Sequence, residues 1–284
     1  MLHDSDGEPT LPYRGRFGAR RPPRLAALAL PPAAMPARQG RRPLKAWRYV
    51  GVFGPELMLC VATVRIGPAR QAFWAVWDRQ AQRLYERTRP GRGRVALATG
   101  RIRVNDGPVQ IALDLTEGPG VEAICPSGAA YGWTRKQGDV PTEGIVTLDG
   151  RRHELRARAV IDDTAAYYER HTRWRWSAGV GTTPQGADVA WNLVSGVNDP
   201  PAASERSVWL DGVVSEPQPV SFSEDLSAVG QLRFCAEATR ERRENRLLVR
   251  SHYRQPFGTF SGSLAPGVQL AEGYGVMEAH DVWW

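Results

Sequence analysis

The stretch TEGIVTLDGRRHELRARAVI, residues 142–161, constrains the fold more than any other part of the sequence. On both sides of Asp149-Gly150, apolar and charged side chains alternate with period two, which places them on opposite faces of extended strands. An Asp-Gly pair suits a two-residue type I′ turn, because both of its central residues take a positive φ. The segment therefore predicts an antiparallel hairpin with one buried face.

Short runs of the same kind fill the chain from Lys45 onward. Gly, Pro, Asn and Asp separate them at positions where a turn needs a positive or a fixed φ. Examples of these runs are KAWRYVGVF, ELMLCVATVRI, QAFWAVWD, RVALATGRIRV, VAWNLVSG and LRFCAEAT. No segment has the period of a long amphipathic helix, and helices do not alternate with strands. We expect an all-β protein whose antiparallel sheets close into barrels or sandwiches.

The segment DDTAAYYERH, residues 162–171, interrupts the series of strands. Asp162 or Asp163 is a suitable N-cap for a short helical turn at this point. We place the boundary between two β domains here, with residues 44–160 in the first and residues 161–284 in the second. Residues 1–43 are rich in proline and arginine, and we expect them to form an arm on the outside of the β domains.

The net charge lies in residues 1–50, mostly in the arm. Ten Lys and Arg side chains against three acidic ones in residues 1–50 account for the whole formal charge of +7. Such an arm predicts attraction to an anionic membrane surface, whereas scattered arginines without interleaved aromatics do not indicate nucleic-acid binding. The three cysteines form no CxxC motif, and no apolar run approaches the ~20 residues of a membrane span. We expect a cytoplasmic protein with reduced thiols.

The most unusual motif is RHTRWRWSAGVG, residues 170–181. In a strand, Trp174 and Trp176 point to one face, and His171 and Arg173 point to the other. The tryptophans either fill a packed core or line a cavity that binds an apolar ligand.

Three further groups favour the cavity: large side chains in the next strand and beyond it, polar residues in the connecting loops, and acidic and histidine side chains near the C-terminus. The candidate ligand-binding residues are Arg173, Trp174, Trp176, Trp191, Asn192 and Trp209, and the candidate catalytic residues are His171, Asp199, Glu278 and His280. No nucleotide-binding or zinc-protease motif is present, so we expect neither a cofactor nor a metal.

Several of these motifs resemble those of the bacterial family named domain of unknown function 2804. They are YERHTRWRWSAGVG, VAWNLVSGVND, SERSVWLDG and GYGVMEAHDVWW, and LPYRGRFG and RPLKAWRYVGVF near the start also fit. More remotely, the chain is similar to calycin-type proteins that include carotenoid hydratases and tocopherol-cyclase-like enzymes. That resemblance implies two tandem lipocalin-like β-barrels that handle long apolar isoprenoids. It transfers no catalytic residue, because the shared pattern is architectural.

Two functions follow from these observations. The first is binding of a long apolar ligand, a lipid or an isoprenoid, without turnover. The second is an enzyme of the hydratase, cyclase or isomerase type that acts on an unsaturated substrate by acid catalysis. In that enzyme, a lyase or an isomerase, His171 or His280 would donate the proton and Asp199 or Glu278 would orient it.

Overall fold

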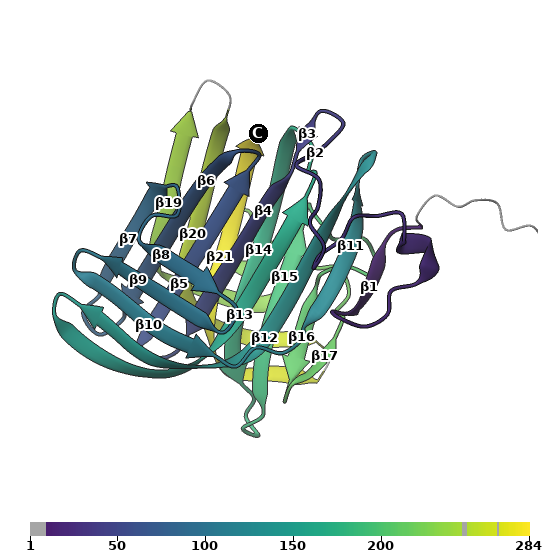
Figure 1. The fold of residues 1–284 in the computed structure, drawn as a ribbon. Helices are drawn as coiled ribbons and strands as arrows, with labels where there is room; N and C mark the ends of the chain where they lie inside the picture. Colours follow the sequence, from purple (N-terminus) through teal and green to yellow (C-terminus); the bar gives the residue numbers. More distant parts are fainter. Residues whose placement is uncertain (1–9, 246–248, 266) are drawn as a thin grey trace, which may run out of the picture.

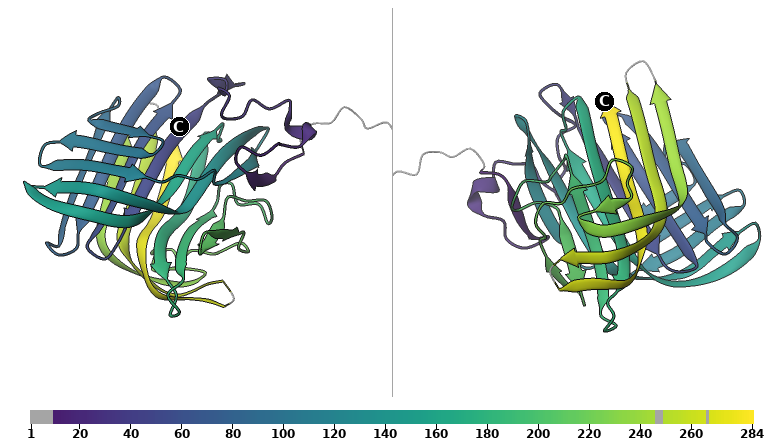
Figure 2. Two further views of the ribbon diagram at one scale, coloured as in Figure 1. Left: turned by 60° about the horizontal axis from the view of Figure 1, so that its bottom comes forward. Right: turned by 180° about the vertical axis from the view of Figure 1, so that it is seen from behind.

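The computed structural model describes residues 10–245, 249–265 and 267–284. Within these residues the chain forms β-strands and one short 3-10 turn, η1 (Pro23–Leu25), but no α-helix. Most strands belong to two antiparallel sheets, each curled into a half-barrel (Figure 1 and Figure 2). The prediction of an all-β fold with two tandem barrel halves is confirmed.

The first sheet holds eleven strands. Along its main path these are β7 (Arg83–Pro90), β6 (Ala69–Asp78), β5 (Leu57–Ile66), β4 (Lys45–Phe53), β13 (Arg151–Ala166), β12 (Ala130–Leu148), β10 (Val109–Leu115), β9 (Arg101–Asp106) and β8 (Val95–Ala98). Off this path, β11 (Val121–Ser127) pairs with β12 on one side and with β1 (Tyr13–Arg16) on the other. The sheet curls so that β8, β9 and β10 lie across β4, β5 and β6 (Figure 1).

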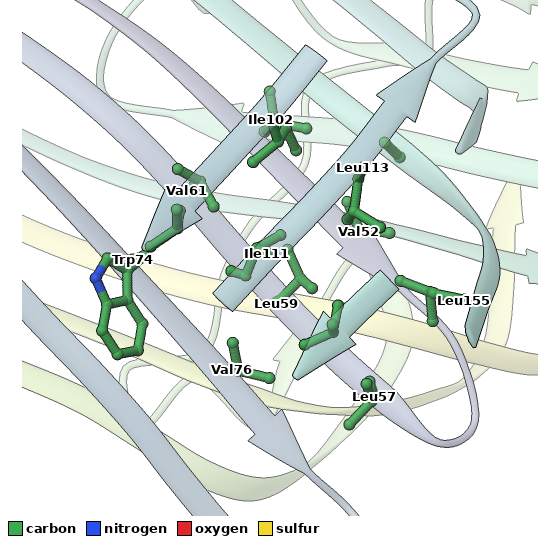
Figure 3. Close-up of a cluster of buried hydrophobic side chains, with 14 of the residues drawn as sticks. Val52, Leu57, Leu59, Val61, Trp74, Val76, Ile102, Ile111, Leu113 and Leu155 are labelled. Carbon is green, nitrogen blue, oxygen red and sulfur yellow. The ribbon is translucent and has the colours of Figure 1, made fainter. Parts of the chain in front are cut away.

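A closely packed apolar core fills the first half-barrel. Figure 3 shows Val61 and Leu59 of β5 facing Ile102, Ile111 and Leu113 of the covering strands. These side chains stand on alternate positions of their strands, as the period of two requires. The interior of the first half-barrel is therefore packed with apolar side chains.

The predicted hairpin is confirmed. It joins β12 to β13 at Asp149 and Gly150, which take φ values of 49° and 81°. The following strand continues through Asp162 and Asp163 to Ala166, so no helical turn forms there. Ion pairs of Asp162 with Lys136 and of Asp163 with Arg48 hold the two aspartates in the strand and offset their poor strand propensity.

The second sheet follows directly and holds eight strands. In spatial order these are β17 (Val213–Ser215), β16 (Ser207–Leu210), β15 (Asp188–Ser195), β14 (His171–Thr182), β21 (Val268–Trp283), β20 (Arg250–Ala265), β19 (Gln231–Asn245) and β18 (Ala228–Val229). This sheet curls around its own core, which includes Trp191, Phe234 and Phe260. A separate two-stranded ribbon, β2 (Arg38–Gln39) with β3 (Arg42–Pro43), lies near the start of the chain.

The two half-barrels pack with their outer faces together. Met58, Cys60 and Ala75 of the first sheet contact Ala178 and Val276 of the second in a third apolar core. This core occupies one end of the interface between the sheets, and at the other end the sheets leave a cavity between them.

The N-terminal arm lies against β11 and β12. Leu25, Leu30 and Met35 of the arm are buried in a small apolar core that the arm forms with β11 and β12. Arg21 also donates two hydrogen bonds to the buried carboxylate of Glu122, with distances of 3.0 and 2.6 Å. The arm is thus docked by both apolar contacts and an ion pair.

Candidate functional site

The cavity between the sheets has a volume of about 500 Å³. Its walls come from the first part of β4, the end of β5 and the start of β6 on one sheet, and from β14, β19, β20 and β21 on the other. This volume lies within the ordinary range for small-molecule sites, roughly 300–1,000 Å³. The cavity therefore belongs to the interface of the half-barrels and not to the interior of either one.

A row of aromatic rings forms one wall. Trp47 of β4 stacks on Trp174 of β14 with a centroid distance of 6.1 Å and an interplanar angle of 11°. Tyr168 also stacks on Trp47, and Trp284 also stacks on Trp174. Trp176 meets Tyr49 edge to face, with 5.2 Å between the centroids. A planar or branched apolar ligand would find large aromatic surfaces here.

Strand pairing brings two polar side chains beside the indoles. In the register of β14 with β21, Trp174 is opposite His280 and Trp176 is opposite Glu278. Since directly opposite residues of an antiparallel pair share a face, all four side chains point to the cavity.

Glu278 is a buried acid of the cavity wall. Its carboxyl accepts a hydrogen bond of 2.7 Å from Trp174 Nε1 and one of 2.9 Å from Gln255 Nε2. Burial raises the pKa of Glu278 to about 7, although the hydrogen bond from Trp174 opposes this shift. A substantial fraction of Glu278 therefore carries a proton at neutral pH.

The pKa of His280 is shifted in the opposite direction, so this side chain carries no positive charge at neutral pH. Its ring lies edge to face against Trp174 at 4.3 Å, and its Nε2 is 2.8 Å from Ser251 Oγ. Burial, assisted by the nearby charge of Arg240, lowers the pKa of His280 to about 3. His280 is consequently neutral at physiological pH and can relay a proton only through a neutral ring.

A buried charged cluster lines another part of the wall. Lys136 Nζ lies 2.5 Å from Asp162 Oδ1 and 3.2 Å from Glu205 Oε1. Asp162 also accepts a hydrogen bond from Trp47 Nε1, and Glu205 accepts one from Asn198 Nδ2. Burial acts to lower the pKa of Lys136, but the two carboxylates outweigh it and the pKa is raised. Lys136 therefore stays charged and compensates the acids.

Arg240 of β19 joins the two sheets at the cavity. Its guanidinium lies 4.1 Å from the ring centroid of Phe73 and 4.8 Å from that of Tyr253. Its Nη2 donates to Thr88 Oγ1 at 2.9 Å, and its Nε is 3.3 Å from Glu86. A fixed cation thus stands beside the aromatic wall.

Of the ten candidate residues from the sequence, four meet at this cavity, namely Trp174, Trp176, Glu278 and His280. Their roles in binding or catalysis stay predictions.

The other six candidates lie elsewhere. Asn192 is buried behind the wall and accepts a hydrogen bond of 2.8 Å from Trp176 Nε1. Trp191 packs over Gly179 within the second half-barrel, where a Cβ on that glycine would come within 2.3 Å of the indole. Trp209 packs in the same way over Gly138. These three side chains are buried in the surrounding core and do not line the cavity.

Three polar candidates lie outside the cavity as well. His171 stacks on Trp283 and pairs with Asp281 at 2.9 Å, and the exposed Arg173 pairs with the same carboxylate at 2.6 Å. Asp199 accepts a hydrogen bond from the backbone N–H of Gly196, which is a turn contact. The structure gives each of these three a local partner and none a place at the cavity wall.

Side chains of the first half of the chain contribute to the cavity although no motif marks them. Trp47, Tyr49 and Phe73 alternate in strands, but the alternation does not reveal which other strand they face. Arg240 and Tyr253 lie on the neighbouring strands β19 and β20, and no sequence motif marks them either. The available signal was the density of aromatic residues in KAWRYVGVF and QAFWAVWD, which exceeds that of residues 170–181.

Among the described residues, no helix is long and apolar enough to cross a membrane. In the same residues, no group of three or more His, Cys, Asp and Glu side chains is arranged to hold a metal ion.

The fold places the chain in a class of proteins that are built from two β half-barrels. A candidate AttH from Nitrosomonas europaea has this fold, with a TM-score of 0.52, 14% identity and coverage of 89% of this chain and 98% of its own. Kievitone hydratase from Nectria haematococca is similar as well, with a TM-score of 0.50, 11% identity and coverage of 83% and 88%. At these identities the likeness shows the fold alone.

The sequence defines the family more closely. Residues 89–284 match the model of the family described as Domain of unknown function (DUF2804), and the chain belongs to that family. No curated protein matches the chain.

Proposed function

We propose that the protein binds an apolar small molecule of the lipid or isoprenoid class in the cavity between its two sheets. The observation that supports this proposal is a cavity of about 500 Å³ at the interface of two half-barrels, with stacked indoles in its wall. Burial of roughly 400 Å² of apolar ligand surface at ~25 cal/mol/Å² provides at most about 10 kcal/mol before ordering costs. That is sufficient for stable binding.

Removal of an indole from the wall should weaken binding. We expect Trp174→Ala and Trp176→Ala each to raise the Kd for farnesol or palmitic acid about tenfold or more, because each removes a large apolar contact surface. Calorimetric titration measures this without depending on indole fluorescence. Trp283→Ala is the matched control, since Trp283 is exposed and stacks on His171 outside the cavity. Equal affinities of all three variants would contradict the proposed site.

Acid catalysis is the second candidate function, and one observation favours it. Glu278 holds a proton near neutral pH beside electron-rich indole faces, which stabilise positive charge. In this reaction Glu278 transfers its proton to one carbon of a ligand double bond, which leaves a cation at the other carbon. The cation then adds water, which gives up a proton to the Glu278 carboxylate, or it loses a neighbouring C–H proton to that carboxylate and forms a new double bond. A hydratase among the proteins of this fold supports the same chemistry.

Deuterium exchange tests the acid role. An unsaturated ligand that binds should acquire carbon-bound deuterium from D2O in the wild-type protein, and Glu278→Gln should abolish that exchange while binding continues. Absence of exchange in every bound ligand would rule out this catalysis and leave the binding function standing.

A further inference from the structure

The cavity opens at one end of the molecule. Among its wall residues, Ala69, Arg70 and Pro90 are exposed, and they lie at the start of β6 and at the end of β7. The β2–β3 ribbon, the C-terminus and the start of β20 lie at the same end (Figure 1). The register of β20 with β21, which places Arg250 opposite Trp283, agrees with this view. The opening therefore belongs to a surface that these segments form together.

Arginines without a carboxylate partner gather on this surface. Each is exposed or half-buried, and no carboxylate of the described residues lies within salt-bridge distance of its guanidinium. These arginines are Arg38, Arg41, Arg65, Arg70, Arg92, Arg170 and Arg250. The surface around the opening therefore carries positive charge that the protein itself does not compensate.

Two of these arginines face each other across one turn. In the register of β5 with β6, Arg65 is directly opposite Arg70. Like charges at such positions destabilise an antiparallel pair. The backbone N–H of Gly91 also donates a hydrogen bond of 2.8 Å to the carbonyl oxygen of Arg70, which brings Arg92 to the same place. Anionic groups bound at this end relieve the repulsion among these side chains.

At the opposite end of the molecule, arginines are paired with acids. Around the turn that joins β6 to β7, Arg79 lies 2.7 Å from Glu237, and Arg83 lies 2.7 Å from Asp149. The uncompensated charge is thus directed toward the end at which the cavity opens. Such an asymmetry orients a protein on a negatively charged surface.

Apolar side chains lie among the arginines of the opening. Ile66 and Pro90 belong to the cavity wall there, and Trp283 is 44% exposed between His171 and Arg250 on the neighbouring strands. An exposed indole among cationic side chains is typical of proteins at a membrane–water interface. A nucleic acid pairs with the cations but leaves the apolar opening without a partner, whereas an anionic membrane matches both features.

We propose that this end of the protein docks on the anionic surface of a lipid bilayer, with the cavity opening toward the headgroups. The arginines bind anionic headgroups, and the apolar ligand passes between bilayer and cavity without crossing water. The docking surface stands by itself, whereas this source of the ligand rests on the proposed function. The N-terminal arm contributes Arg38 and Arg41, because its Arg14 and Arg21 are occupied by contacts within the protein.

Sedimentation with vesicles tests the docking surface. The wild-type protein should bind vesicles made of equal parts of phosphatidylcholine and phosphatidylglycerol but not vesicles of phosphatidylcholine alone, both at physiological salt. The triple variant Arg41→Gln, Arg92→Gln and Arg250→Gln should bind the anionic vesicles about 100-fold more weakly, because it lacks three charges at the membrane surface. These three side chains do not line the cavity, so binding of farnesol in solution should be unchanged.

A matched control removes the same charge elsewhere. Arg151, Arg156 and Arg233 are exposed and lie in the first halves of β13 and β19, away from the opening. The triple variant Arg151→Gln, Arg156→Gln and Arg233→Gln should lower the affinity for anionic vesicles by less than about threefold, because salt screens charges that are distant from the membrane. Thermal unfolding checks that both triple variants are folded.

The outcomes separate the two proposals. Equal affinity of the wild-type protein for both kinds of vesicle, or equal losses in the two triple variants, overturns the docking surface. Tighter binding of a mixed-sequence DNA duplex than of the anionic vesicles assigns the surface to nucleic acid and likewise overturns it. The proposed function fails separately if the wild-type protein binds neither farnesol nor palmitic acid in solution.

Discussion

Lys136→Met is expected to destabilise the protein by about 3–5 kcal/mol at pH 7, because it leaves two buried carboxylates without their cation. Lys136 is almost completely buried, and its ammonium lies 2.5 Å from Asp162 and 3.2 Å from Glu205. Methionine occupies a similar volume, so the loss arises from charge and not from a cavity. Denaturant unfolding at constant pH measures it.

A matched control uses an exposed ion pair. Arg152 and Glu154 lie 3.1 Å apart with most of both side chains exposed, so Arg152→Met should change the free energy of unfolding by no more than about 0.5 kcal/mol. Adding Glu205→Gln to Lys136→Met should recover part of the loss, since one uncompensated acid is removed. If Lys136→Met behaves like the surface control, the buried cluster does not stabilise the fold in the way described.

The cluster also explains why the expectation of a helical turn at Asp162 or Asp163 was wrong. Aspartate is depleted in strands, so Asp162 and Asp163 read as a turn or a helix cap. In the structure both lie within β13, each with a cation and hydrogen bonds from the neighbouring strands. Local propensity was overridden by partners that are distant in sequence, and only the three-dimensional arrangement reveals them.

The candidate site was predictable as far as strand alternation extends. Alternation placed Trp174 and Trp176 on one face of their strand. The C-terminal motif GYGVMEAHDVWW contained Glu278 and His280, which pair with these tryptophans across β14 and β21. His171 was chosen for its residue type, but its odd-numbered position puts it on the opposite face, against Trp283. Alternation assigns faces within a sheet and cannot identify the sheet that packs against them.

The other half of the site depends on packing between sheets. Trp47 and Tyr49 lie more than 120 positions before Trp174 in the sequence, yet their rings contact Trp174 and Trp176. No turn or pairing signal links these segments, because they belong to different sheets. The cavity arises from how the half-barrels meet.

Glu278→Gln is expected to change how stability depends on pH, because only the wild-type side chain can release a proton. The folded state holds that proton to a pKa of about 7, whereas the unfolded chain releases it near 4.5. The stability that protonated Glu278 contributes is complete below pH 4.5 and is lost as the pH rises through about 7. Relative to the wild type, Glu278→Gln should therefore gain about 3 kcal/mol between pH 4.5 and pH 8.

The comparison of variant with wild type removes the effect of His280. The pKa of His280 is lowered by burial to about 3, so its contribution is complete above the unfolded pKa of 6.5 and is lost as the pH falls. Both proteins contain this histidine, and its effect cancels in the difference between them. Unfolding by denaturant at several pH values supplies the two curves.

Glu237→Gln is the control with the opposite sign. Glu237 also accepts a hydrogen bond from an indole, that of Trp77, at 2.9 Å. Burial acts to raise its pKa, but the hydrogen bonds from Arg79 and Trp77 outweigh it, and the pKa is lowered. Relative to the wild type, Glu237→Gln should therefore lose stability as the pH rises from the lowered pKa of the folded state to about 4.5, and the difference should stay constant at higher pH. A pH-independent difference for Glu278→Gln would show that Glu278 titrates as an ordinary acid, and the acid-catalysed function would then lack its proton donor at neutral pH.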